Sequence, residues 1–249
     1  MKKLIILLFS LLLIFTHSRA ESIIDQANDA YSAANFEKAA QLYKDAINQN
    51  GESAIMYYNL GNTYYRLNQI APAILSYERA LLLDPGNKDI RFNLEIAKLK
   101  TVDKIESVGD FFLTEWFTDL RNLRNTDQWS FLGITSFLLF VVCLFLFFFS
   151  RKIILKKIGF FAGLLLVVIC VFCNVFAFNQ KKKLTERNTA IIFSATTTIK
   201  SSPDVSGTDL FILHEGTKVE VKNKVGDWTE IETADGNVGW IPTKEIEVI

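Results

Sequence analysis

The sequence is nearly without histidine and has no excess of charge of either sign. His17 and His214 are the two histidines among 249 residues, and 27 Lys and Arg balance 27 Asp and Glu. The sequence therefore has too few histidines for a His-based metal cluster or for a nucleophile that a histidine activates. No basic field draws the chain onto nucleic acid, and no Gly-rich phosphate loop is present. The sequence predicts no catalytic residue, no metal site, no cofactor and no nucleic-acid partner.

Cysteine is absent from every polar part of the sequence. Cys143 lies in one apolar segment, and Cys170 and Cys173 lie in another. The Cys170-x-x-Cys173 spacing is that of a thiol redox motif, but such a motif needs a helix N-terminus and solvent to stabilise the thiolate, and lipid offers neither. We interpret these cysteines as structural and keep a thiol redox enzyme only as a contrasting hypothesis.

Long apolar runs are what the sequence has in abundance, with 21 Phe against 4 Pro. The first is residues 1–20, in which Lys2 and Lys3 precede an apolar run that ends in Ser18-Arg19-Ala20. This layout predicts a secretory signal peptide cut after Ala20. An uncleaved anchor is the alternative, and either one exports the residues that follow.

Two further runs, residues 129–150 and 158–178, are uncharged and match the roughly 20 residues that span a bilayer. Residues 151–157 between them contain four positive charges, which predicts a cytoplasmic loop. Both flanking domains then face the periplasm of a bacterial inner membrane. Lys181, Lys182 and Lys183 argue weakly for the opposite orientation, and we interpret them as part of a solvated or headgroup-touching linker, residues 179–188.

Residues 21–104 contain an internal repeat. Ala27 recurs as Gly61, Ala39 as Ala73, Tyr43 as Tyr77 and Ala46 as Ala80, which is the roughly 34-residue period of tetratricopeptide repeats. Small residues at these positions let paired helices approach closely. A partial third copy has Glu95 at the small-residue position and no recognisable second helix. It predicts a capping helix on a short array that leans on its neighbours or on a partner.

The first helix of each repeat pair predicts a concave surface that binds an extended peptide, through amides for its backbone and aromatics for contact area. The alternative, equally weighted for each residue, is that the tyrosines simply pack between helices. The candidate groove residues are Asn28, Tyr31, Tyr58, Asn62, Tyr65, Arg66 and Phe92.

Residues 105–128 form an amphipathic juxtamembrane stretch, with apolar residues such as Phe112, Trp116 and Leu120 at helical spacing. It predicts an interfacial helix on the outer leaflet, with Trp129 at headgroup level. The alternative is that its apolar stripe packs on the last repeat helix.

Residues 189–249 alternate as short strands, with turn signals at Gly226-Asp227 and Asp235-Gly236. With Trp228 and the string Gly239-Trp240-Ile241-Pro242, this segment resembles the bacterial SH3 family. Trp228 and Trp240 are candidates for a ligand shelf, the alternative being that they complete the core of a small domain. The expected fold class is a multidomain membrane protein: an α-helical tetratricopeptide repeat domain, two transmembrane helices and a small all-β SH3-like barrel.

The order of these segments resembles the BatE-like aerotolerance-operon proteins. That resemblance implies partners among the other membrane proteins of the operon, which carry von Willebrand A domains or tetratricopeptide repeats, and a cytoplasmic MoxR-type ATPase. The functional hypothesis is a periplasmic scaffold, without enzyme activity, that gathers such proteins in an oxidative-stress complex. The alternative is a cell-envelope anchor that binds peptidoglycan through the SH3-like domain.

Overall fold

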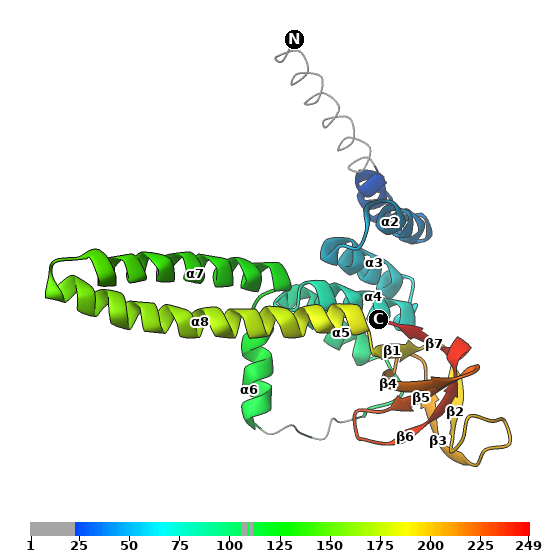
Figure 1. Ribbon diagram of the computed structural model, residues 1–249. Coiled ribbons are helices and arrows are strands. Elements are labelled where there is room, and N and C mark those ends of the chain that lie inside the picture. The colour runs from blue at the N-terminus through cyan, green and yellow to red at the C-terminus, as the bar shows by residue number, and fades with distance from the viewer. Residues whose placement is uncertain (1–22, 106–108, 110–111) are drawn as a thin grey trace, which may run out of the picture. The chain divides into compact units, whose positions relative to one another are not determined.

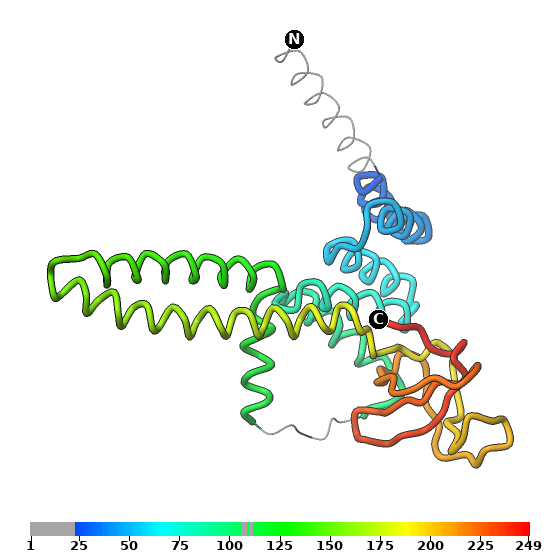
Figure 2. Tube along the Cα trace, viewed as in Figure 1, coloured from blue at the N-terminus to red at the C-terminus, as the bar shows by residue number. Residues whose placement is uncertain are grey.

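The computed structural model describes residues 23–105, 109 and 112–249, so the predicted signal peptide lies outside the described residues. The chain forms two compact units (Figures 1 and 2). One contains the helices up to residue 109, except for residues 84–86, together with residues 188–249. The other contains those three residues and residues 110–187. The first unit is thus built from two ends of the chain that are separated by the second.

The helices of the first unit follow the predicted repeat. Residues 23–32 pair with α2 (Phe36–Asn50), α3 (Ala54–Arg66) pairs with α4 (Ile70–Leu83), and α5 (Lys88–Lys98) stands alone. Ala34 and Asn68 occupy equivalent turns, and both have a φ of 58°. The small residues Ala27, Ala39, Gly61 and Ala73 are all buried between helices, as close packing requires.

The β domain has seven strands in the order β3-β2-β6-β5-β4-β1-β7, and every pairing is antiparallel. The strands are β1 (Thr189–Ile192), β2 (Thr196–Lys200), β3 (Asp209–His214), β4 (Lys218–Val225), β5 (Trp228–Glu232), β6 (Val238–Pro242) and β7 (Ile246–Val248), with a 3-10 turn η1 (Thr243–Glu245) before β7. The alternation seen in the sequence places Ile199, Val219, Ile231 and Ile241 inside a small apolar core.

The β domain also completes the core of the repeats. Ile191 in β1 and Ile249 at the chain end are buried in the same cluster as Ile74 and Tyr77 of α4, and Phe193 packs against it. The second helix that the third repeat copy lacks is thus replaced by strands. The short array leans on the SH3-like domain of its own chain.

The second unit is a helical hairpin with a short helix before it. Its helices are α6 (Phe112–Arg121), α7 (Thr126–Phe149) and α8 (Ile153–Glu186). The last two are long and apolar enough to cross a membrane. The turn between them occupies residues 150–152, so the rest of the predicted 151–157 loop is the start of α8. The predicted linker 179–188 is helical through Glu186, and the helix ends at Arg187, whose φ is 40°.

The cysteines lie within this hairpin. Cys173 is buried beside Trp129 and Phe176, and the Cys170 thiol lies 3.5 Å from the carbonyl oxygen of Gly133. All three thiols are free. Cys170 and Cys173 thus contact neighbouring residues of the hairpin, and the structural interpretation of the cysteines stays a prediction.

Candidate interaction surfaces

The two helix pairs that carry the predicted groove residues contain the same hydrogen bond twice. The Tyr43 hydroxyl on α2 donates to Asn28 Oδ1 at 2.6 Å, and the Tyr77 hydroxyl on α4 donates to Asn62 Oδ1 at 2.8 Å. Burial raises the pKa of both tyrosines, so both hydroxyls stay protonated and donate at neutral pH. Each predicted groove asparagine is therefore oriented by a tyrosine of the paired helix.

The second copy extends into a network. Asn93 on α5 donates to Asn62 Oδ1 at 2.8 Å and to the Tyr58 hydroxyl at 3.1 Å. The Oδ1 atom of Asn62 thus accepts hydrogen bonds from within the protein. Among the described residues, neither the Asn62 Nδ2 group nor the Asn28 Nδ2 group donates to a protein acceptor. These two amides are the groups left to donate to a bound backbone carbonyl.

Sequence reasoning missed the hydrogen bonds by which buried Tyr43, buried Tyr77 and Asn93 orient the groove asparagines. The repeat itself contained the signal for these contacts. Tyr43 and Tyr77 stand at equivalent repeat positions, and so do Asn59 and Asn93. A polar residue that recurs at a repeat period is a candidate for a recurring polar contact.

The remaining groove candidates fall into separate places. Tyr31 contacts Phe36 edge to face at 5.4 Å, and the Arg66 guanidinium lies over the same Phe36 ring at 5.1 Å. Tyr65 lies under the Lys100 ammonium, 4.1 Å from the ring centre. Tyr31, Tyr58 and Tyr65 pack partly against the repeat core, whereas Phe92 is 66% exposed. The tyrosines are thus shared between packing and surface, and Phe92 belongs to the surface.

The SH3-like domain presents both candidate tryptophans on one face. β5 pairs with β6 so that Trp228 opposes Pro242 and Glu230 opposes Trp240, which places the two indoles diagonally on the same side. Both are half-buried, and neither belongs to the apolar core of the domain. The exposed side chains of Ile212 and Val238 lie on the same outer face. The geometry favours the shelf interpretation over the core one.

Polar contacts fix the SH3-like domain to the repeats. Glu78 of α4 is buried between Lys218 Nζ at 2.6 Å and Lys98 Nζ at 3.5 Å. Burial alone would raise the pKa of the Glu78 carboxyl, but the two ammonium groups outweigh it and hold the pKa below its ordinary value. Arg79 adds a hydrogen bond to the Val248 carbonyl at 2.6 Å and an ion pair with Glu247.

A second polar contact involves the segment after α5. The Asp103 carboxylate accepts hydrogen bonds from the His214 backbone N–H and the Thr217 hydroxyl, both at 2.7 Å, and lies 2.8 Å from His214 Nδ1. Partial burial alone would raise the pKa of Asp103, and the Thr217 and His214 hydrogen bonds hold it below its ordinary value. The one histidine downstream of the predicted signal thus serves domain docking.

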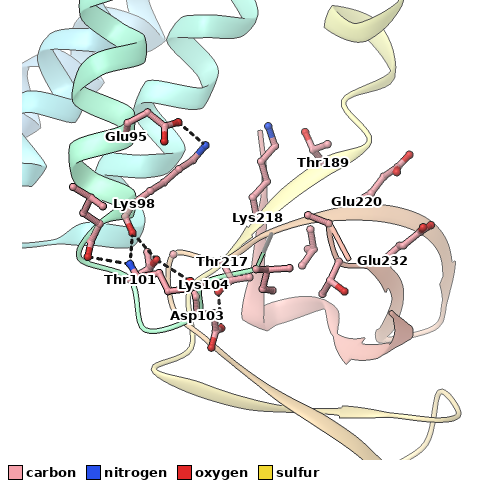
Figure 3. A pocket seen from close by; sticks show the side chains of 16 residues that line it. Glu95, Lys98, Thr101, Asp103, Lys104, Thr189, Thr217, Lys218, Glu220 and Glu232 are labelled. Atoms are coloured by element: carbon pink, nitrogen blue, oxygen red, sulfur yellow. Dashed lines mark hydrogen bonds and ion pairs between the residues drawn. The ribbon is translucent and has the colours of Figure 1, made fainter. Parts of the chain in front are cut away.

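A cavity of about 790 Å³ lies beside this contact, between the end of α5 and strands β1, β4 and β5 (Figure 3). Its charged residues are satisfied locally: Lys98 pairs with Glu95, and Lys104 Nζ donates to the carbonyls of Lys98 and Leu99. Among the described residues no group of three or more metal-ligating side chains occurs. The cavity was not predicted, because its two walls are far apart in the sequence.

Two family models match parts of the chain. Residues 54–87 match the tetratricopeptide repeat, and residues 195–247 match the bacterial SH3 domain. The predicted fold class is thereby confirmed: a helical region with a tetratricopeptide repeat, two long apolar helices and an antiparallel all-β SH3-like domain. These two domains define a protein that binds other molecules. The narrower resemblance to BatE-like proteins stays a prediction.

One solved structure in the comparison is that of the Yersinia enterocolitica type III secretion chaperone SycD in complex with a peptide of the translocator YopD. It is 14% identical, with a TM-score of 0.32, and the match covers 62% of this chain and 94% of that one. Among curated proteins there is no match to this chain.

Proposed function

We propose that this protein is a membrane-anchored adapter without enzyme activity, which holds a peptide segment of a protein partner in its repeat groove. The observation that carries the proposal is the duplicated Tyr–Asn contact, which aims amide donors of successive repeats at one surface. Amides at regular spacing suit an extended backbone. The SH3-like face, with Trp228 and Trp240, offers a second and separate contact.

The proposed location is the bacterial inner membrane, with α7 and α8 as spans and both folded ends in the periplasm. Support comes from the shared core, because α4 packs on Ile191 and Ile249, which lie beyond both apolar helices. Residues in one core must occupy one compartment. Arg151, Lys152, Lys156 and Lys157 at the opposite end of the hairpin favour the cytoplasmic side for the turn.

The proposed partners are other membrane proteins of an aerotolerance operon, including von Willebrand A domain and tetratricopeptide proteins, as the BatE resemblance implies. Two weak binding surfaces on one compact, anchored unit gain from effective concentration, so neither surface needs high affinity alone. An oxidative-stress role follows from the resemblance alone.

The groove is tested by affinity purification of the solubilised full chain from its native membrane. Arg66→Ala with Phe92→Ala should reduce recovery of operon membrane proteins several-fold, since both side chains are exposed on the groove. Lys44→Ala with Val205→Ala removes one exposed cation and one exposed apolar side chain elsewhere and should leave recovery unchanged. Equal recovery from both double variants would contradict the groove assignment. Point variants are preferred to a deletion of residues 188–249, which would remove part of the repeat core.

The second candidate function is peptidoglycan binding through the SH3-like face, and the shared orientation of Trp228 and Trp240 favours it. Full-length protein is sedimented with purified sacculi. Binding that falls with Trp240→Ala and persists with Ile55→Ala, an exposed apolar residue of α3 in the repeats, supports this function. Absence of co-sedimentation of the unaltered protein would remove it.

A further inference from the structure

The short helix α6 has an apolar stripe that is largely exposed to solvent. Phe112, Leu113, Trp116 and Phe117 are all exposed, Trp116 by 57%, and α6 buries none of its residues. Trp116 and Phe117 contact each other edge to face. Glu115 and Thr118 lie on the opposite side of the helix. Such a helix needs an apolar surface to lie against.

Hydrogen bonds from both α7 and α8 fix the C-terminal end of α6 to the hairpin. Gln180 of α8, which is buried, donates to the carbonyls of Arg121 at 2.7 Å and Arg124 at 2.6 Å. Trp129 of α7 donates its indole N–H to the same Arg121 carbonyl at 2.8 Å. The last carbonyls of a helix normally lack partners, and here two other helices supply them.

This attachment sets both the direction and the rotation of α6. Figure 1 shows α6 running across the α7–α8 hairpin and not along it. Leu120, on the same stripe as Trp116, packs beside Trp129, Cys173 and Phe176. The stripe therefore faces the side on which the apolar part of the hairpin lies.

The attachment also lies at one end of both proposed spans. Trp129 begins the apolar run of α7, and Gln180 follows that of α8, next to Lys181, Lys182 and Lys183. A helix held there, across the spans and with its stripe turned toward their apolar part, lies in the plane of the membrane surface. Indole rings and cationic side chains are the residues typical of this level.

We propose that α6 lies on the lipid surface of the membrane, its stripe of Phe112, Leu113, Trp116 and Phe117 inserted among the outer-leaflet acyl chains and its orientation fixed by Gln180 and Trp129. The inference rests on the proposed membrane anchoring. Its occupant is lipid, because the stripe continues into Leu120, which packs beside Trp129, Cys173 and Phe176 of the proposed spans.

The test is spin-label accessibility in full-length protein reconstituted into vesicles of phosphatidylethanolamine and phosphatidylglycerol, with Cys143, Cys170 and Cys173 changed to Ala. Single labels are placed at Leu113→Cys and Trp116→Cys on the stripe, at Glu115→Cys opposite, and at Phe137→Cys in α7. We expect oxygen, which partitions into lipid, to relax the stripe labels and Phe137→Cys, and a water-soluble nickel chelate to relax Glu115→Cys.

Stripe labels that the nickel chelate reaches as well as it reaches Glu115→Cys would overturn the proposal, as would stripe labels shielded from both reagents by protein. In either case a lipid-exposed Phe137→Cys label would leave the membrane anchoring intact. Nickel access at Phe137→Cys would instead refute the anchoring. Gln180→Leu should shift the stripe labels toward water while Phe137→Cys is unchanged, and an unaltered depth would contradict the role given to Gln180.

Discussion

At the scale of residues, the contact between repeats and SH3-like domain depends on Gly216. Its φ is 84°, a left-handed conformation that glycine adopts most readily. A Cβ there would stand 2.7 Å from Thr101 Cγ2 and 3.2 Å from Ile74 Cδ1. Gly216 is thus needed both for its left-handed backbone conformation and for the close approach of the two domains.

Gly236 offers a matched comparison, because its φ is 85° and nothing lies within 4 Å of a Cβ built on it. Both Gly→Ala variants incur backbone strain of roughly 1–2 kcal/mol. Gly216→Ala should lose about 1–3 kcal/mol more through overpacking at the domain contact. Thermal unfolding of the full chain in detergent measures the difference, and equal melting temperatures would contradict the packing described here.

The acidic residues of the same contact predict a dependence on pH. The pKa values of Glu78 and Asp103 are lowered in the folded state, from ordinary values of 4.5 and 3.8. Their stabilisation is therefore fully present above those values and is lost as the pH falls through the lower folded-state pKa values. Domain docking should weaken only in acid.

Spin labels at Gln49→Cys in α2 and Lys224→Cys in β4, both exposed positions, report docking in the cysteine-free chain as a distance distribution. We expect one narrow distribution at neutral pH that broadens below the ordinary pKa of Glu78. Glu78→Gln should already broaden it at neutral pH, because Lys98 and Lys218 lose their shared partner. A distribution that is equally narrow in acid would show that these carboxylates do not hold the domains together.

At the scale of elements, the α7–α8 hairpin packs through two glycines of α8 with different room around them. A Cβ at Gly159 would meet the Cys143 carbonyl oxygen at 2.7 Å, whereas one at Gly163 would make ordinary contacts at 3.5 Å. Small residues let membrane helices approach in this way.

Gly159→Ala should therefore destabilise the hairpin by about 1–3 kcal/mol, since backbone must move. Gly163→Ala should be neutral or gain up to about 1 kcal/mol from helix propensity. Thermal unfolding in detergent followed by far-UV circular dichroism compares the two. A larger loss for Gly163→Ala would mean that the helices pack in another register.

The sequence predicted those elements whose determining residues lie close together in the chain. The repeat period, the strand alternation and the two apolar runs of the hairpin each act over a few tens of residues, and each predicted its element. The Tyr–Asn contacts were within reach of the same repeat comparison. The attachment of α6 by Gln180 could not be predicted from the sequence, because a single glutamine after an apolar run does not indicate which group it binds.

At the scale of the whole molecule, the sequence predicted that the repeats lean on a neighbour or a partner, but not that this neighbour is the last domain of the chain. Three residues of α4 contact residues that follow the whole hairpin in the sequence. Ile74 shares a core with Ile191, Glu78 pairs with Lys218, and Arg79 pairs with Glu247. Each of these residues has an ordinary explanation in its own element, so no local pattern marked the pairs. The consequence is functional, since one body carries both proposed binding surfaces.

The central claim, that the repeats and the SH3-like domain form one body on one side of a membrane, is tested most directly by site-specific labelling. Single cysteines at Gln49, Lys224 and Arg151 in the cysteine-free full chain are exposed to a membrane-impermeant maleimide in intact spheroplasts. The account predicts labelling at Gln49→Cys and Lys224→Cys and none at Arg151→Cys until the cells are lysed. Labelling of only one of the two domain sites in intact spheroplasts would contradict it.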